Sequence, residues 1–417
     1  MSEKEVALPE PVSADRPAPL PPPRGFARLR SALERSYWEC MEFLESAANR
    51  RARAIVMSGA EKHSGLPLRV LYFGSGNHLA WVQGLLYREH RVLEEHSGLK
   101  VWNARSRIAQ HRSAVDLVVA DLPWPWQRLL TGQVMVEVPA WINQRMPLPG
   151  KWQDVFGQLR RSARGEDMRS IRKHRLEYRL VRDEEAVRRF YDELYVPHLT
   201  RRFGAAAYIE PAWKIAWCVE TGTLMEIRRG GQLVAAQVLW GNRGSMHFLW
   251  SGALGEEFGS HSRGVFPALY YYGILHSFEQ GCDEVDYCGS RPVLSDGIVQ
   301  LKRRWGGRVF DGWSRDTLFI RPLHLRDANR ELLARNPLIA RRDGGLVGKL
   351  FFGTEPVGPA DVERTEQLYA TPGITEIRLY SLLPPLPETL EAARARPAIE
   401  IVDLSAEPDP AAAYCRR

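Results

Sequence analysis

The chain lacks any run of about 18 consecutive apolar residues, and its first residues carry acids and prolines where a signal peptide carries basic and then apolar residues. It has only five cysteines, with no Cys-x-x-Cys pair and no histidine at zinc-finger spacing. These absences argue against a membrane-spanning helix, a disulfide framework and a structural zinc site. We therefore expect a cytoplasmic protein, either free or at the inner surface of the membrane.

The composition is that of a folded protein. Hydrophobic residues make up 44% of the 417 residues, charged residues 26% and aromatic residues 10%, which argues against collagen-like, coiled-coil and wholly disordered chains. At roughly 150 residues per domain, this length predicts two or three domains. The net charge of +7 allows an acidic partner, such as a nucleic acid, a phosphorylated cofactor or an anionic membrane, without requiring one.

Two segments near the N-terminus differ in their pattern. Residues 1–24 are rich in proline and poor in aromatic residues, which predicts disorder. In residues 25–62, apolar side chains recur at three- and four-residue spacing from Phe26 through Tyr37 to Ala48, which predicts an amphipathic helix. A helix of this kind either packs against the folded domain or lies on a membrane surface or a partner.

Strand and helix patterns alternate in residues 63–150, which predicts an α/β domain. We expect strands over 66–73, 98–102, 115–122 and 134–138, and a helix near 78–96. The turn Gly74-Ser75-Gly76 after the first strand is compatible with a nucleotide-binding loop. Because the third glycine of that fingerprint and an acid after the second strand are missing, we favour a tight turn that uses the backbone freedom of glycine.

Residues 151–325 form the next predicted domain, which begins with a concentration of positive charge. Between residues 158 and 175 there are seven lysines and arginines and two acids, a local balance of +5. Such a run is either a solvated helix face or a surface for phosphates. Over 176–321 we expect a strand, two helices, strands at 223–229, 232–240 and 245–253, a helix, a strand, a helix and further strands. The proline- and alanine-rich extension, 326–417, is expected to be partly disordered.

Two motifs stand out in this domain: Asp286-Tyr287-Cys288-Gly289-Ser290-Arg291, and Leu301-Lys302-Arg303-Arg304-Trp305-Gly306-Gly307. With the order of elements and the basic stretch from Arg169 to Lys173, they resemble the GNAT acyltransferases and, within them, the FemABX-like group, which includes proteins associated with exopolysaccharide and cellulose production. Cys288 stands where that family has a glycine, and Leu301 where it usually has an aromatic residue. The resemblance implies a GNAT-like mixed sheet flanked by helices in the C-terminal half, and a smaller, reduced GNAT-like α/β domain before it.

The resemblance also implies acyl-coenzyme A as the donor, with acetyl-coenzyme A as the expected form by family precedent. In this fold two splayed strands offer backbone groups to the pantetheine, and the start of the next helix holds the diphosphate. The strand at 245–253 and the glycine- and serine-rich loop after it occupy the corresponding place. Donor binding is accordingly assigned to Trp250, Gly252, Arg263, Gly264 and Arg303. The loop departs from the usual Gln/Arg-x-x-Gly-x-Gly/Ala pattern, as it does in members of the group that use aminoacyl-tRNA.

Three catalytic candidates follow from the motifs. The Lys302 ammonium is expected to stabilise the oxyanion of the tetrahedral intermediate, unless it belongs to a solvated basic face. Asp286 is expected to deprotonate the acceptor directly or through water, unless it is a capping carboxylate or pairs with Arg291. Tyr287 would protonate the leaving thiolate, or else pack in the core. No metal is predicted, because no carboxylate lies at metal-ligand spacing from His247, His261 or His276.

Together these observations predict an acyltransferase that moves an acyl group from acyl-coenzyme A to an amine or hydroxyl by direct attack in a ternary complex. The expected acceptor is a small molecule or a glycan precursor: a sugar, an amino acid or an envelope or polysaccharide precursor. One alternative is a peptide-bond-forming ligase that uses aminoacyl-tRNA, which the basic segment favours. Another is a non-catalytic assembly protein that uses residues 25–62 for peripheral membrane contact.

Overall fold

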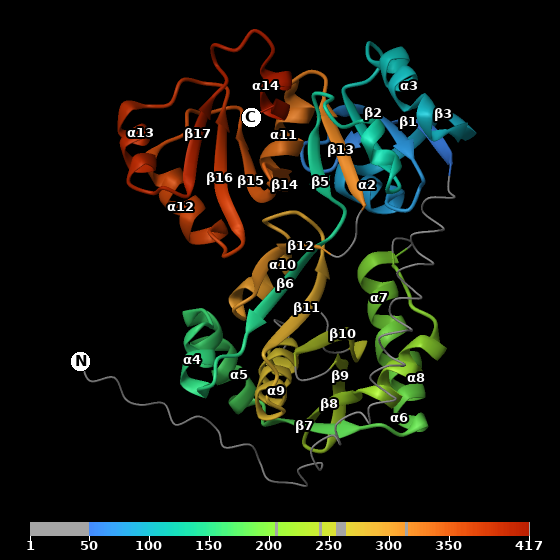
Figure 1. The fold of residues 1–417 in the computed structure, drawn as a ribbon, viewed down its shortest axis with the longest axis vertical. Helices are drawn as coiled ribbons and strands as arrows, with labels where there is room; N and C mark the ends of the chain where they lie inside the picture. The colour runs from blue at the N-terminus through green and yellow to red at the C-terminus, as the bar shows by residue number, and fades with distance from the viewer. Residues whose placement is uncertain (1–49, 205–206, 242–243, 256–263, 313–315, 417) are drawn as a thin grey trace. The chain divides into compact units, whose positions relative to one another are not determined.

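The computed structural model describes residues 50–204, 207–241, 244–255, 264–312 and 316–416, which divide into two compact units (Figure 1). Of these residues, unit 1 contains 145–288 and 302–307, and unit 2 contains 50–144, 289–301 and 308–416, apart from the gaps given above. Within the described residues, no helix has the length and apolar character needed to cross a bilayer. Each unit is described separately below.

Unit 1 is built on a mixed sheet. The strand order is β6 (Ile142–Pro147), β11 (Glu284–Ser290), β10 (Ser245–Ala253), β9 (Gln232–Gly241), β8 (Thr223–Arg229) and β7 (Leu176–Val181). Strands β7 to β10 pair antiparallel in succession, whereas β10 and β11 are parallel. The strands predicted at 223–229, 232–240 and 245–253 are therefore confirmed to within one residue.

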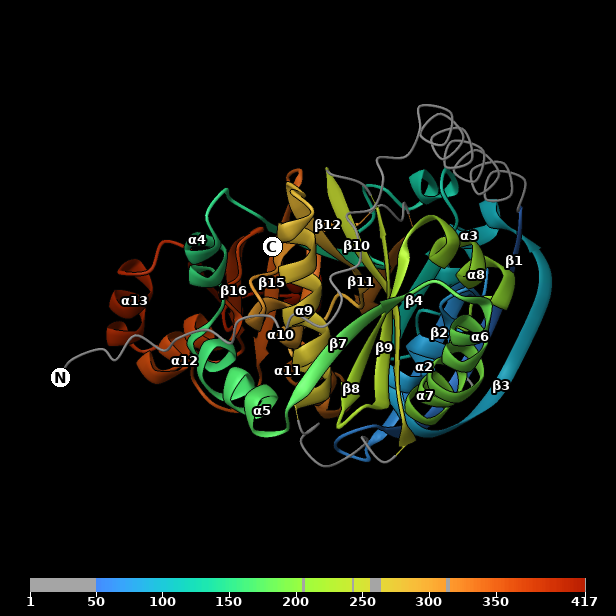
Figure 2. The same ribbon diagram turned by 90° about the horizontal axis from the view of Figure 1, so that it is seen from below.

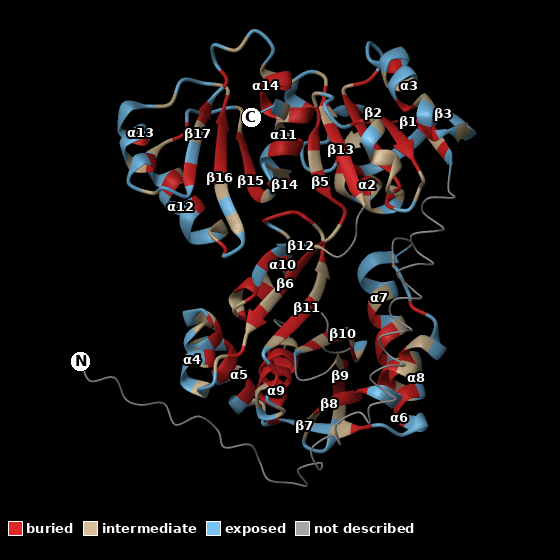
Figure 3. Cartoon of the chain, in the orientation of Figure 1, coloured by how far each residue is buried: buried red, intermediate tan, exposed pale blue. Residues whose placement is uncertain are grey.

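Helices cover both faces of this sheet (Figure 2). One face carries α9 (Val265–Glu279), which is buried along almost its whole length because its sequence is apolar on nearly every side (Figure 3). The other carries a continuous helical segment and a separate helix: α6 (Glu184–Arg189), the π-helical η4 (Phe190–Tyr195), α7 (Val196–Phe203) and α8 (Ala212–Thr221). Asp183 caps α6, since its Oδ1 accepts the Ala186 amide at 2.8 Å. The predicted GNAT-like order of elements is confirmed.

The basic segment of unit 1 forms short helices, and one further helix carries the Lys302 motif. The bounds are α4 (Trp152–Gly157), η3 (Ala163–Asp167), α5 (Met168–Lys173) and α10 (Gly297–Arg304). Arg164, Arg169, Arg172 and Lys173 are all exposed. The predicted helical character of this segment is therefore confirmed, and its charge faces solvent.

Unit 2 contains two sheets. The six-stranded sheet has the order β3 (Tyr87–Lys100), β1 (Arg51–Glu61), β2 (Pro67–Gly74), β4 (Leu117–Leu122), β13 (Thr317–Pro322) and β5 (Val136–Pro139). The four-stranded sheet has the order β14 (Leu338–Arg342), β15 (Gly345–Phe352), β16 (Ile374–Ser381) and β17 (Ile399–Asp403). The other elements of unit 2 are α2 (Leu79–Leu86), η1 (Val101–Asn103), α3 (Ala104–His111), η2 (Trp126–Leu129), β12 (Arg308–Asp311), α11 (Asp327–Arg335), α12 (Pro359–Tyr369), α13 (Pro387–Arg394) and α14 (Pro410–Arg416).

Two helix predictions in this part of the chain are wrong. The helix expected near 78–96 ends at Leu86, and residues 87–100 form the edge strand β3 instead. The amphipathic helix expected over 25–62 is contradicted at its end, because residues 51–61 form β1, while 25–49 lie outside the described residues. The helical spacing itself ends at Ala48, and pairing of β1 with both β2 and β3 buries Ile55 and Met57 in the sheet.

The C-terminal extension is ordered as far as residue 416, so the expectation of partial disorder is wrong for 326–416. Prolines in this region begin helices: Pro359, Pro387 and Pro410 each occupy a first helical turn, where the missing amide costs nothing. The alanines after Pro410 are buried. The domain boundaries differ as well, because β13 pairs with β4 and β5 and so completes the sheet of the predicted N-terminal domain.

The Gly74-Ser75-Gly76 turn is closed by an acid rather than open to a phosphate. Asp121, at the end of β4, accepts hydrogen bonds at Oδ2 from the Tyr72 hydroxyl at 2.5 Å, the Ser75 hydroxyl at 3.2 Å and the His78 amide at 3.3 Å. A carboxylate at this position would repel a phosphate. Gly76 has φ of +93°, as expected for a tight turn that depends on glycine.

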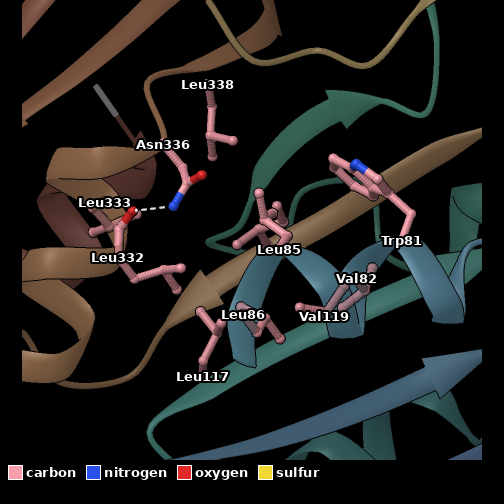
Figure 4. Close-up of a pocket in the computed structure, with 11 residues that line it drawn as sticks. Trp81, Val82, Leu85, Leu86, Leu117, Val119, Leu332, Leu333, Asn336 and Leu338 are labelled. Atoms are coloured by element: carbon pink, nitrogen blue, oxygen red, sulfur yellow. Dashed lines mark hydrogen bonds between the residues drawn. The ribbon is translucent and has the colours of Figure 1, made fainter. Parts of the chain in front are cut away.

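A pocket in unit 2 is lined by α2, β4, β13 and α11 and is almost entirely apolar (Figure 4). Its polar lining residue, Asn336, donates through Nδ2 to the Leu332 carbonyl at 2.9 Å. No charged or nucleophilic side chain lines it. This pocket therefore has no group suited to acyl transfer chemistry.

Candidate active site

Strands β10 and β11 pair only at their first residues. The register joins Ser245 to Glu284, Met246 to Val285 and His247 to Asp286, and the ladder ends there. On its other edge β10 stays paired with β9 as far as Ala253, with an irregularity between Phe248 and Ser251. Two parallel strands therefore diverge after His247 and Asp286, which leaves backbone groups between them able to bind a ligand.

A cluster of functional side chains lies where the strands begin to diverge. His247, Asp286 and Cys288 each offer a polar atom within 4.8 Å of the others. The His247 Nδ1 lies 3.7 Å from the Asp286 Oδ2. Because His247 and Asp286 are register partners, their side chains emerge on the same face of the sheet. The expectation that His247 has no carboxylate neighbour is wrong.

Both oxygens of Asp286 are already engaged. The residue is 1% exposed, its Oδ1 accepts the Cys288 amide at 2.7 Å, and its Oδ2 accepts the Arg145 Nε at 3.0 Å. Arg145 also lies 3.5 Å from Glu284, measured from Nη1 to Oε1. The ion-pair partner of Asp286 is therefore Arg145 and not Arg291. A carboxylate fixed by two hydrogen bonds is suited to orienting the neighbouring His247 imidazole.

Arg291 has different surroundings, within unit 2. Its guanidinium carbon lies 3.7 Å from the centre of the Trp141 ring and 4.8 Å from that of Trp81. Its Nη1 donates to the Ala140 carbonyl at 3.2 Å and lies 3.3 Å from the His78 Nδ1. Burial lowers the pKa of Arg291 to about 10. The stacking of Arg291 on two tryptophan rings indicates that this arginine has a structural role.

Cys288 has a left-handed backbone conformation, with φ of +60°. A side chain is strained in this conformation, which fits the glycine that the family resembled by this sequence has here. Two contacts hold the turn: the Cys288 amide donates to Asp286, and the Cys288 carbonyl accepts the Lys302 Nζ at 3.0 Å. Burial, with the nearby Asp286 charge, raises the pKa of the thiol to about 12. The thiol is therefore protonated at neutral pH.

Replacing Cys288 by glycine is expected to stabilise the fold by about 0.5–1 kcal/mol, because relief of roughly 1–2 kcal/mol of left-handed strain exceeds the added entropy of the unfolded chain. Urea denaturation measures this change. Cys288→Ala is the matched control, since it removes the thiol but keeps the strain. Equal or lower stability of the glycine variant relative to the alanine variant would show that the backbone at this position is not strained.

The Lys302 motif is not a solvated basic face. Lys302 is 4% exposed and Arg303 6% exposed. One of the three N–H groups of Lys302 is committed to the Cys288 carbonyl. Arg304 lies 3.3 Å from Asp167, measured from Nε to Oδ2. Lys302 thus reaches the cluster through the backbone of Cys288, which fixes the turn that presents Asp286.

Tyr287 lies in the aromatic core of unit 1. Its hydroxyl donates to the Trp305 carbonyl at 2.6 Å, and its ring centre lies 5.4 Å from that of Phe248 and 5.2 Å from that of Tyr270. Burial raises the pKa of Tyr287 well above its ordinary value. With its proton engaged by a carbonyl, Tyr287 fits the core-packing alternative better than the role of proton donor to a leaving thiolate.

The described residues assigned to donor binding have different local surroundings. Gly252 is required for packing, because a Cβ there would lie 2.6 Å from the carbonyl carbon of Leu194. Trp250 packs against the core beside α8, with the Lys214 Nζ 5.9 Å from its ring centre. Gly264 caps α9 at φ of +77°, and a Cβ on it would lie 2.9 Å from the Ser170 hydroxyl. Arg263 lies outside the described residues.

The donor set of His247, Asp286 and Cys288 includes residue types that bind transition metals. The electrostatics of the cluster do not favour a cation, because Arg145 contacts Asp286 and Lys302 contacts the Cys288 carbonyl. A histidine beside a carboxylate that is held by an arginine suits a proton-transfer site instead. His247 and Arg145 are the candidate site residues that sequence reasoning missed, and only the pairing of strands brings them to Asp286.

Comparison with known proteins agrees with the order of elements in unit 1. Residues 157–293 match the family model described as acetyltransferase (GNAT) domain. Comparison with curated proteins gave no significant match.

Among solved structures, the chain is similar to FemX, at 9% identity and a TM-score of 0.35, with 64% of this chain and 83% of that chain covered. It is also similar to L-PGS from Bacillus licheniformis, at 9% identity and a TM-score of 0.33, with 67% and 87% covered. A tandem GNAT protein from the clavulanic acid biosynthesis pathway is 11% identical, with a TM-score of 0.26 and 66% and 85% covered. The family match over residues 157–293 and the order of elements both indicate that this part of the chain carries a GNAT acyltransferase domain, as its motifs predict.

Proposed function

We propose that the protein transfers an acyl group from acyl-coenzyme A, with acetyl as the simplest case, to an amine or hydroxyl of a sugar, an amino acid or an envelope or polysaccharide precursor. The observation that carries this proposal is the divergence of β10 from β11 directly after the His247 and Asp286 pair. The opened backbone suits the amides of a pantetheine, and the pair stands where the thioester would enter. Direct attack in a ternary complex then needs only positioning and proton transfer.

His247 is the general base in this proposal. Its Nδ1 lies 3.7 Å from the Asp286 carboxylate, and in this role Nδ1 would carry the proton directed at Asp286 while Nε2 would accept the proton of the attacking group. Asp286 orients the imidazole and stabilises its charged form, and Arg145 fixes Asp286. Lys302 is a positioning residue, because it acts through the Cys288 carbonyl.

The donor is tested by isothermal titration with acetyl-coenzyme A and longer acyl-coenzyme A thioesters. We expect micromolar binding that weakens about tenfold in Arg263→Ala, since this arginine directly precedes Gly264 in the sequence and its guanidinium would suit the diphosphate of the donor. Arg179→Ala, an exposed arginine on β7, is the matched control and should bind normally. No binding of any thioester by the wild-type chain would contradict the donor assignment.

An aminoacyl-tRNA donor is the second candidate, and one observation favours it. Arg161, Arg164, Arg169, Arg172 and Lys173 are exposed and have no ion-pair partner among the described residues. Gly264, at the start of α9, packs against Ser170 of the same segment, so this charge adjoins the helix that would bind donor phosphates. A steep loss of activity between 50 and 200 mM salt, on the order of 10³-fold for several phosphate contacts, would identify this donor.

A further inference from the structure

The end of α7, the segment after it and the start of α8 together expose four large hydrophobic side chains. Phe203 is 40% exposed, Tyr208 74%, Ile209 37% and Trp213 58%. They lie within eleven residues of sequence and are four of the thirteen large hydrophobic residues that are exposed in the described part of the chain. Single exposed hydrophobic residues are common, but a cluster of this kind marks an interaction surface.

Positive charge accompanies these side chains. Arg201 and Arg202 are exposed and directly precede Phe203, and the guanidinium carbon of Arg202 lies 5.2 Å from the centre of the Phe203 ring. The acid of the segment, Glu210, is buried and bound by the Lys214 Nζ at 2.9 Å and 3.0 Å. Its charge is therefore already compensated. We call Arg201, Arg202, Phe203, Tyr208, Ile209 and Trp213 the α7–α8 patch.

The surroundings of His198 show the same excess of positive charge. This histidine is buried on α7, one turn before the arginines. Burial lowers the pKa of His198 to about 4, with Arg202 and Arg201 contributing in the same direction. A site with this potential attracts an anionic partner.

The residue types of the α7–α8 patch favour a lipid surface over a nucleic acid as the anionic partner. Tryptophan and tyrosine rings favour the boundary between lipid headgroups and acyl chains, and arginine places an apolar stem there with its charge among phosphates. Phosphates alone, as in a nucleic acid, would give no reason to expose Ile209 and Phe203. We propose that the α7–α8 patch binds the surface of a bilayer containing anionic phospholipids, with its aromatic side chains at headgroup level and its arginines among the phosphates. This binding is peripheral and does not depend on the acyl transfer reaction.

Co-sedimentation of the full chain with phospholipid vesicles tests the proposal. We expect binding to phosphatidylcholine vesicles that contain phosphatidylglycerol, and much weaker binding to phosphatidylcholine alone. Phe203→Ser with Trp213→Ser should lower the partition coefficient at least about tenfold, and Arg202→Gln about fivefold, the effect of one interfacial charge. Trp102→Ser is the matched control, because Trp102 is 51% exposed but lies in unit 2, and it should leave binding unchanged.

Two results would overturn the proposal. One is no binding of the wild-type chain to the phosphatidylglycerol vesicles. The other is undiminished binding of the double variant, which would place the membrane contact elsewhere in the chain. The substituted side chains are exposed, so the variants should fold, and thermal unfolding of each variant verifies that they do.

Discussion

Replacing His247 by alanine is expected to lower the rate of acyl transfer by about 10²- to 10⁴-fold, the range that general base catalysis supplies. The loss should fall on kcat, because the imidazole acts on the proton of the acceptor and does not hold the donor. Thioester binding, measured by titration, should be unchanged. Coenzyme A release in the presence of an amine acceptor measures the rate.

The control for this variant is His63→Ala, which removes an exposed imidazole of unit 2. It should transfer acyl groups at the wild-type rate. A His247→Ala protein with full activity would show that the pair on β10 and β11 is not the proton-transfer site. If acyl transfer were undetectable in the wild type while the biological function survived the substitution, the non-catalytic assembly role would be favoured.

Substitution of Asp286 is expected to have the second large effect. The alanine and asparagine variants should differ in stability. Asp286→Ala removes the acceptor of the Cys288 amide and the counter-ion of Arg145, and it is expected to destabilise the fold by about 2–3 kcal/mol. Asp286→Asn keeps an oxygen for the Cys288 amide and should cost about 1 kcal/mol. Both variants should lose most activity, because neither keeps the charge that orients His247.

Urea denaturation and the transfer assay together separate these roles. The decisive variant is Asp286→Asn, which should be folded and nearly inactive. Arg145→Ala is the companion variant, since it removes the ion-pair partner of Asp286 but leaves the carboxylate and its bond to Cys288. A fully active Asp286→Asn protein would reduce Asp286 to a structural group that holds the Cys288 turn.

Local patterns predicted the elements of unit 1 well, because each is set by nearby residues. Alternating apolar residues and glycine turns define β8, β9 and β10, and these strands agree with the sequence to within one residue. The two motifs also predicted that Asp286 and Lys302 belong to one site. They could not show that Lys302 contacts the Cys288 carbonyl instead of Asp286 itself. That contact depends on the left-handed conformation of Cys288.

The sequence did not predict His247 as a site residue, because its position beside Asp286 results from the pairing of two strands. It lies 39 residues before Asp286 in the sequence, and only the parallel register of β10 with β11 makes them neighbours. The failures in unit 2 have the same cause. Residues 87–100 are polar enough for several local structures, and antiparallel pairing with β1 selects the strand. The proline content of the C-terminal extension predicted partial disorder, although Pro387 and Pro410 each begin a helix that buries alanines.

The most direct test of the central claim follows acetyl groups from acetyl-coenzyme A to a panel of amino sugars, amino acids and hydroxyl acceptors, with wild-type and His247→Ala proteins side by side. We predict one coenzyme A released for each acceptor acylated by the wild type, and loss of both products in the variant while thioester binding persists. Absence of acyl transfer from any thioester, with product formed only from aminoacyl-tRNA, would contradict the proposed donor. Equal turnover by the two proteins would contradict the proposed base.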